Sequence, residues 1–93
     1  MKVVLASVGN PDFRQDPDKP LFGCEPNKTV EVKDMKEARD KCMAFIQEND
    51  LGGGNWAGGE IMDEKGKVIA IVSYSGRVWE GSTLTGNNKQ IIL

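Results

Sequence analysis

Apolar residues along the chain change their spacing in a way that predicts strands, then a helix, then strands again. The first run, Lys2 to Val8, is apolar and β-branched and predicts a short buried strand. Residues 29–33 alternate between polar and apolar side chains, as a half-buried strand does. From Asp34 the apolar residues recur at helical spacing, which predicts one amphipathic helix of about four turns. We expect Asp34 to cap its start and Gly52 to end it in a left-handed conformation. The helical spacing runs through Met35, Ala38, Cys42, Phe45, Ile46 and Asn49.

The second half of the chain predicts a hairpin and further short strands. Residues 60–62 lead into Asp63-Glu64-Lys65-Gly66, whose glycine suits a turn with positive φ. Residues 68–72 are apolar on both faces, which predicts the central strand of the sheet. A turn at 74–77 and a short strand at 78–79 follow. The order β-β-α-β-β predicts an α+β fold: a small antiparallel sheet of four to five strands with one amphipathic helix packed on one face.

Length and charge bound the classes of protein that this chain can represent. With 93 residues it is expected to form a single small domain over residues 1–93. Lys and Arg total 12 against 14 Asp and Glu, and a net charge of −2 argues against a bulk electrostatic grip on nucleic acid, although a local basic patch stays open. No apolar run approaches the roughly 20 residues of a membrane span, and the start does not resemble a secretory signal. We therefore expect a cytoplasmic protein with no membrane partner.

The absence of histidine restricts the chemistry further. It removes Ser-His and Cys-His nucleophilic pairs and the commonest metal ligand. Cys24 and Cys42 alone do not make a zinc site, and in a reducing compartment both are expected to be free thiols. Asp12, Asp16 and Asp18 are spaced so that they could gather oxygen ligands, but the EF-hand order is missing, so we interpret them as solvated acids. We expect no catalytic residue, no metal and no cofactor.

A glycine loop at 51–59 is the most unusual segment, with five glycines around Trp56. Glycine clusters mark backbone that needs positive φ or close approach to a ligand, a partner or a neighbouring strand. Two interpretations stay open: a helix cap followed by a strand with bulges near Gly58 and Gly59, or a binding loop. The loop also fits the dinucleotide fingerprint, but it runs from helix to strand, the reverse of what that site requires. Its candidate binding residues are Gly53, Gly54, Asn55 and Trp56.

A long loop over residues 9–27 holds all four prolines, so neither a helix nor a central strand fits it. Loops of this length in a compact domain are usually functional or disordered. Phe13, Leu21 and Phe22 are the residues able to anchor it to the core. An ordered binding loop, a plain Ω-loop and disorder all remain open, and Phe13 and Arg14 are its candidate binding residues.

Tyr74, Arg77 and Trp79 form a third group of candidates. With Trp56 they include both tryptophans and the only tyrosine, and Trp, Tyr and Arg are the residue types that dominate binding energy at interfaces. Arg77 can stack between aromatic rings, grip an anionic group or form a plain surface ion pair. The tryptophans can instead supply core to a small domain. We expect Trp56, Arg77 and the loop around Phe13 to lie on one side of the molecule.

Three functions are compatible with these residues. The first is a non-catalytic binding module that acts by protein–protein interaction, for instance as an inhibitor of the kind that phages and mobile elements encode. The second is sequestration of a small anionic ligand, such as a nucleotide, between Arg77, Trp56 and the glycine loop. The third is a small histidine-free enzyme that uses a carboxylate, Asp12 or Glu60, or Cys24 as a nucleophile.

The C-terminal segment, residues 81–93, predicts a flexible polar tail that ends in three large apolar residues, Ile91-Ile92-Leu93. Chain ends are normally polar and frayed unless they are tied down, and a small sheet has open edges. We therefore expect the last residues to pack on a sheet edge or groove, on a second copy of the chain rather than on their own domain. This predicts a homo-oligomer.

Overall fold

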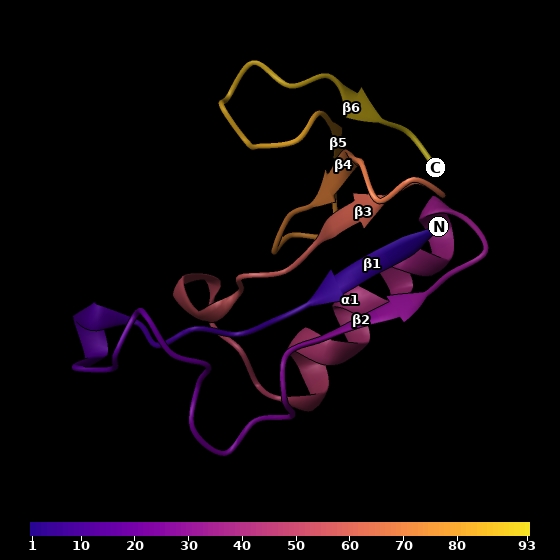
Figure 1. The fold of residues 1–93 in the computed structure, drawn as a ribbon. Helices are drawn as coiled ribbons and strands as arrows, with labels where there is room; N and C mark the ends of the chain where they lie inside the picture. The colour runs from indigo at the N-terminus through magenta and orange to yellow at the C-terminus, as the bar shows by residue number, and fades with distance from the viewer.

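The computed structural model describes residues 1–93 and shows one helix packed against a six-stranded antiparallel sheet (Figure 1). The predicted α+β class is confirmed, and the sheet has six strands rather than four to five. Their order in space is β2-β1-β3-β4-β5-β6, so β4 is an interior strand, as expected. The helix α1 spans Met35–Glu48, and two short 3-10 helices are η1 (Pro11–Phe13) and η2 (Gly53–Asn55). The strands are β1 (Lys2–Leu5), β2 (Lys28–Glu31), β3 (Glu60–Met62), β4 (Val68–Val72), β5 (Val78–Glu80) and β6 (Gln90–Ile91).

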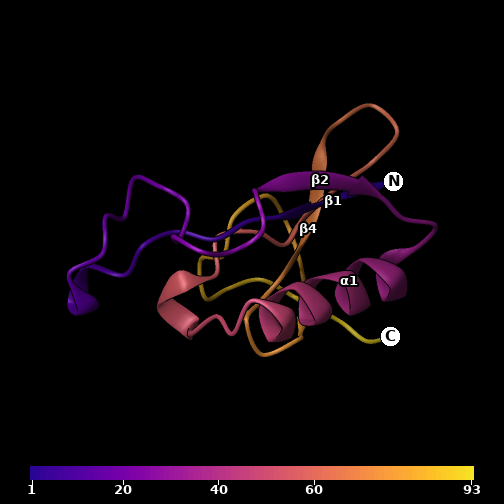
Figure 2. The ribbon, with the colours of Figure 1, turned by 90° about the horizontal axis from the view of Figure 1, so that it is seen from below.

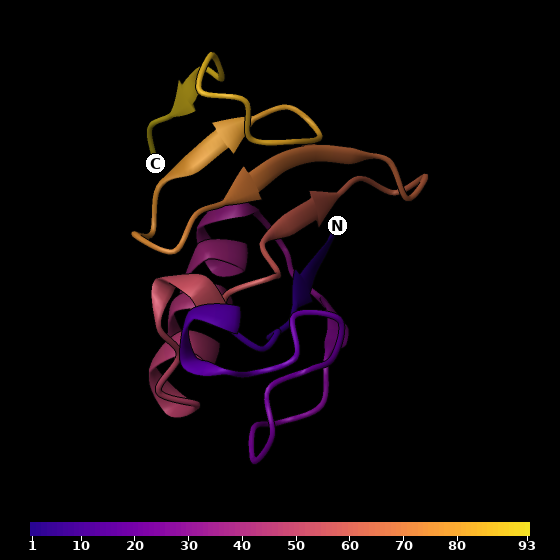
Figure 3. The same ribbon diagram turned by 90° about the vertical axis from the view of Figure 1, so that its left-hand side faces the viewer.

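The sheet is strongly twisted, and α1 covers only part of one face. In Figure 2, β4 crosses the direction of β1 and β2 steeply, whereas α1 lies alongside β1 and β2. Figure 3 shows β5 and β6 lying beyond the part of the sheet that α1 covers. Between helix and sheet lies the hydrophobic core, to which α1 contributes the four residues predicted from its spacing, Ala38, Cys42, Phe45 and Ile46. The strands contribute Val3, Leu5, Ile61, Ala70, Val72 and Val78 to the same core.

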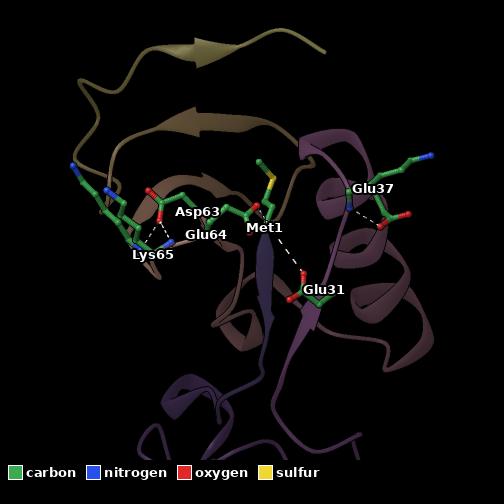
Figure 4. Close-up of polar contacts among 8 residues, drawn as sticks. Met1, Glu31, Glu37, Asp63, Glu64 and Lys65 are labelled. Carbon is green, nitrogen blue, oxygen red and sulfur yellow. Dashed lines mark hydrogen bonds and ion pairs between the residues drawn. The ribbon is translucent and has the colours of Figure 1, made fainter.

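The start of α1 is the capped turn that the sequence predicts. The Asp34 carboxylate accepts a hydrogen bond of 2.8 Å from the backbone N–H of Glu37. The Glu37 carboxylate in turn accepts one of 3.0 Å from the backbone N–H of Lys33 (Figure 4). These two bonds satisfy N–H groups at the helix start, where no helical partner exists.

The end of α1 differs from the prediction, because Asp50 and not Gly52 takes the left-handed conformation. Asp50 has φ 52°, whereas Gly52 has φ −82°. The N–H of Leu51 donates to the carbonyl oxygen of Ile46 at 2.9 Å, and the N–H of Asp50 donates to the carbonyl oxygen of Gln47 at 3.2 Å. These two hydrogen bonds form a Schellman motif. In this motif the residue after the left-handed position is apolar and packs back on the helix. Leu51 is buried there, and its fit in the core sets where the helix ends.

Two hairpin turns share one geometry. The predicted turn after β3 is confirmed, with Gly66 at φ 81°, and the turn before β5 has Gly76 at φ 87°. The Asp63 carboxylate accepts hydrogen bonds from the backbone N–H groups of Lys65 and Lys67, which fixes the first turn (Figure 4).

The N-terminal ammonium group lies beside this first turn. It contacts the carboxylate of Glu64 at 3.0 Å and that of Glu31 at 3.8 Å (Figure 4). Because Glu31 belongs to β2 and Glu64 follows β3, this ammonium bridges the two neighbours of β1.

The C-terminal segment forms a strand on its own sheet. Gln90–Ile91 pairs with β5 as β6, so the expectation that the tail docks on a second copy is corrected for these residues. Asn88 orders the preceding loop by donating to the carbonyl oxygens of Glu80 at 2.7 Å and Thr83 at 2.8 Å. Only Ile92 and Leu93 extend past the strand, and Ile92 is 82% exposed. The structure contains no helix with the length and apolar composition that a membrane crossing requires.

Replacing Asp50 with glycine tests the helix end. Glycine adopts positive φ without a Cβ clash, and the change also removes a negative charge from the negative end of the helix dipole. We expect Asp50→Gly to raise the free energy of unfolding by about 0.5–1 kcal/mol in urea denaturation. Asp50→Asn removes only the charge and should give a smaller gain. A fall in stability with Asp50→Gly would contradict the assignment of this position.

Candidate functional site

A groove of about 540 Å³ opens between η2, the end of β4 and the loop that joins β5 to β6. We call it the aromatic groove because Trp56 and Tyr74 both line it. It brings together three of the residues predicted from the sequence, Gly53, Trp56 and Tyr74. The lining residues are Gly53, Trp56, Ala57, Gly58, Glu60, Ile71, Val72, Ser73, Tyr74, Ser82, Thr83 and Leu84.

Trp56 lies half-buried between the core and the groove. Its indole N–H donates a hydrogen bond of 3.1 Å to the carbonyl oxygen of Val72, at the end of β4. Its ring centroid lies 6.2 Å from that of Phe45 on α1, with the planes tilted by 52°. A tilted aromatic pair of this kind adds packing energy beyond the area it buries. Trp56 therefore belongs both to the core and to the wall of the groove. The sequence had left open whether the tryptophans supply core or form a binding surface, and Trp56 has a position that serves both.

Tyr74 forms another side of the groove from the turn between β4 and β5. Its hydroxyl donates a hydrogen bond of 2.9 Å to the carbonyl oxygen of Leu51, just after α1. Its ring lies next to Gly53, close enough for ordinary van der Waals contact with a Cβ placed there. The tyrosine is thus fixed at its hydroxyl end while 44% of its surface stays exposed.

The glycines of the loop serve mainly the close approach of backbone to backbone. A Cβ on Gly58 would meet the backbone of β1 at Val4, and a Cβ on Gly59 would meet the carbonyl oxygen of Val72. Gly59 also has φ 104°, which L side chains rarely adopt. A Cβ on Gly54 would collide with the side chain of Asn10. The structural interpretation therefore holds for Gly54, Gly58 and Gly59, and Gly53 is the loop glycine that faces open groove.

Asn55 is a structural residue rather than an exposed contact. It is 9% exposed, and its amide nitrogen donates to the carbonyl oxygen of Val8 and to the side-chain oxygen of Gln15, both at 3.0 Å. Its side-chain oxygen accepts from the N–H of Gly52. The polar atoms of Asn55 are thus engaged within the chain, and its role in binding stays a prediction.

The long loop is ordered by polar contacts, not by its phenylalanines. The hydroxyl of Ser7, which is fully buried, accepts a hydrogen bond of 3.1 Å from the N–H of Leu21. The N–H of Ser7 donates to the side-chain oxygen of Asn27 at 2.9 Å. Leu21 packs against the core, but Phe13 is 72% exposed and Phe22 is fully exposed, so these two do not anchor the loop. The long loop and η2 lie toward the end of the molecule opposite the two termini (Figures 1 and 2), whereas the β4–β5 turn reaches the C-terminal residues, with which Gly76 and Arg77 share a hollow.

The remaining candidates lie outside the groove. Arg14 is exposed after η1, with φ 60°. Arg77 lines a separate hollow of about 210 Å³ with Arg39 and the last three residues, so it does not meet Trp56 in one site. Trp79 lines a further hollow of about 220 Å³ that shares Leu84 with the aromatic groove.

Most of the groove residues were not predicted as binding residues, and Leu84 and Ile71 are two of them. Leu84 is 51% exposed and is the one large apolar side chain in the stretch 81–88, a signal that the sequence did contain. Ile71 is buried on the face of β4 that points away from the core, and only the folded β5–β6 loop reveals what surrounds it.

Glu60 gives the groove its charge. Burial raises the pKa of its carboxyl above the usual value, an effect that its own backbone N–H partly opposes. Glu60 takes part in no ion pair, and no lysine or arginine lines the groove. Burial, together with the Glu60 carboxylate, also raises the pKa of Cys42 to about 12, so this core thiol stays protonated. No group of three or more carboxylates or thiols is arranged to hold a metal ion, and Asp12, Asp16 and Asp18 are exposed.

No protein-family model matches the chain, and neither a curated protein nor a solved structure matches it.

Adding a methyl group to two loop glycines tests the structural interpretation. Gly59→Ala should destabilise the protein by about 2 kcal/mol or more, because it combines a strained φ with a collision against β4. Gly53→Ala is the matched control and should stay within about 0.5 kcal/mol, since its Cβ meets only the edge of Tyr74 at van der Waals distance. Thermal unfolding of both variants measures the difference. Equal losses would show that the loop backbone is assigned wrongly.

Removing the charge of Glu60 tests the electrostatics of the groove. Because the folded-state pKa is raised, the ionised carboxylate costs stability at pH 7, and Glu60→Gln should raise the free energy of unfolding there. The gain should shrink as pH falls through the folded pKa toward 4.5, the ordinary value for the carboxyl, and be absent below it. Denaturation between about pH 3 and 8, roughly the range over which carboxyls titrate, measures this gain in stability. The same substitution at the exposed Glu48, Glu48→Gln, is the control. A gain that is constant with pH would contradict the assigned shift.

Proposed function

We propose that the protein is a non-catalytic binding module that acts through protein–protein contact, with the aromatic groove as its contact site. The observation that carries this proposal is the gathering of Trp56, Tyr74, Ile71 and Leu84 around one open groove. Aromatic side chains that are held rigidly and remain partly exposed lose little entropy on binding and contribute large contact area. Such binding could inhibit the partner. We also propose that the protein acts in the cytoplasm.

The contact surface extends beyond the groove. Leu84 also lines the neighbouring hollow of Trp79, so aromatic and aliphatic side chains continue from Tyr74 across Leu84 to Trp79. A surface of this kind is typical of protein partners, because a small ligand would fill only one of the two hollows.

A small anionic ligand finds less support. The lining of the groove includes no arginine or lysine, and its one ionisable carboxyl, Glu60, would repel an anion. Arg77, which was expected to hold the anion beside Trp56, lines a different hollow. The groove thus favours a partner that is neutral or positively charged.

Catalysis also finds less support. Of its three candidate groups only Glu60, whose carboxyl has a raised pKa, lines the groove, and Asp12 and Cys24 do not join it there. The Ser73 hydroxyl lies 3.0 Å from that of Ser75 and donates to the Arg77 carbonyl oxygen, so no base is in position to activate it. The Cys24 thiol donates to the carbonyl oxygen of Asn49. Asp12 lies exposed on η1 and is not among the residues that line the groove. A homo-oligomer stays a prediction, and the exposed Ile92 beyond β6 is its remaining support.

Photo-crosslinking tests the proposed contact site. A benzophenone amino acid placed at Leu84 of the full chain should capture a discrete protein species from lysate of the native cells, whereas the same probe at Glu48 should not. Excess unlabelled wild-type protein should compete, and Leu84→Asp should compete about tenfold less well, a loss of about 1.4 kcal/mol. Arg77→Ala should compete as the wild type does, because it lies outside the groove. Equal capture from both probe positions, or equal competition by Leu84→Asp, would reject the groove as a protein contact.

A further inference from the structure

We propose that the aromatic groove recognises a positively charged side chain of its partner, an arginine in preference to a lysine, with Glu60 as the counter-charge. This inference rests on the proposed protein-binding function and specifies the chemistry of the partner. It follows from where Glu60 lies, from what surrounds it, and from the shape of the groove walls.

The strand register places Glu60 on the face of the sheet away from the core. Glu60 is the first residue of β3 and lies opposite Ile71 of β4, whereas the next residue, Ile61, lies opposite Ala70 and is completely buried in the core. Because side chains alternate along a strand, Glu60 and Ile71 share the other face. Both line the groove there, and the loop through Leu84 closes over them.

Glu60 stands apart from the acidic residues that have partners. Five ion pairs occur in the structure, and none of them involves it. The acids that do have cationic partners are Asp16, Glu25, Glu31, Asp40 and Glu64. All five of these carboxylates are exposed, so water already stabilises their charge, whereas Glu60 is half-buried. Glu60 is therefore a half-buried charge that has no cationic partner in the chain and that only its own backbone N–H partly compensates.

An incoming cation would offset part of the remaining cost of burying that charge. A buried carboxylate loses hydration, and a partner cation within contact distance restores part of the lost energy. An uncharged apolar side chain in the same place would instead bury the carboxylate further and increase the cost. An anion would meet repulsion. Charge complementarity thus selects a cationic group among the possible occupants.

The groove walls fit the rest of a long cationic side chain. Trp56 and Tyr74 offer aromatic surface, which attracts a cation and stacks well on the planar guanidinium group. Ile71 and Leu84 offer aliphatic surface for the methylene stem. Ser82 and Thr83 line the same groove and bring oxygen atoms that can accept hydrogen bonds. Arginine has five N–H donors in a planar fork, so it uses this lining more fully than the compact ammonium group of lysine.

Peptide titration of the ¹⁵N-labelled full chain tests the inference by NMR. The probes are acetylated, amidated Gly-Ala-X-Ala-Gly peptides in which X is arginine, lysine or citrulline, the neutral isostere of arginine. The arginine peptide should shift the Trp56 indole N–H signal and the amides of Gly53 and Leu84. The lysine peptide should bind more weakly than the arginine peptide. The citrulline peptide should bind about tenfold more weakly or worse, because it keeps the shape and loses the charge.

Two variants connect the binding to Glu60. Glu60→Gln should weaken the arginine peptide by about tenfold or more while leaving the citrulline peptide unchanged, and Glu48→Gln should bind both as the wild type does. The spectrum of each variant confirms that it is folded. Equal binding of arginine and citrulline, an unaffected Glu60→Gln, or no shift of Trp56 up to roughly 10 mM peptide would overturn the inference.

The two proposals fail in different ways. If the Leu84 probe still captures a partner while the arginine peptide does not bind, protein binding stands and cation recognition falls. If the arginine peptide binds through Glu60 but no protein is captured, the groove recognises the charged side chain alone and the proposed protein contact falls.

Discussion

The structure depends on the close approach of residues 56–59 to the backbones on both sides of them. The N–H of Gly59 donates to the Val4 carbonyl oxygen at 2.8 Å, and the Gly59 carbonyl accepts from the N–H of Val72 at 2.9 Å. This segment therefore continues the sheet beyond β3 and joins β1 to β4, where any side chain larger than hydrogen at Gly58 or Gly59 would separate the strands. It also sets the position of Trp56, whose indole bonds the same end of β4. The core beneath the helix and the groove above the sheet thus share one backbone constraint.

The groove is formed by η2, the β4–β5 turn and the β5–β6 loop together with one end of β4, and no second layer of helices contributes to it. Tyr74 is held by Leu51 at the end of α1, and Leu84 belongs to a loop that Asn88 ties down at Glu80 and Thr83. Both anchors are hydrogen bonds to backbone carbonyl groups, so the exposed ring and the exposed leucine are positioned without being buried. Side chains prepared in this way lose less entropy when a partner arrives.

Elements that depend on local pattern could be predicted from the sequence, and elements that depend on tertiary fit could not. The helical spacing and the Asp34 cap identify α1, and the Asp63 turn identifies the β3–β4 hairpin. The helix end at Asp50 depends on how Leu51 fits the core, which no local signal contains. Strand β6 is two residues long, below what periodicity can detect. Arg77 is separated from Trp56 because the next residue, Val78, pairs with Ile91, so Arg77 lies at the hollow beside Arg39 and the last three residues, and this depends on strand pairing rather than on spacing in the sequence.

Glu60 is an exception among the residues of this protein, because its charge lowers the stability of the fold and no contact within the chain explains its presence. Most of the sequence satisfies fold and surface together: buried polar side chains such as Ser7 and Asn55 all have partners, and no buried side-chain nitrogen or oxygen is left without one. The Glu60 carboxyl is half-buried and has no cationic partner in the chain. A glutamine there would fit the same pleat at lower electrostatic cost, so fold stability does not account for a carboxylate at this position. A residue that destabilises the fold and has no structural role is a good candidate for a binding residue. When a partner of opposite charge binds, its charge stabilises the carboxylate that the isolated fold leaves unpaired.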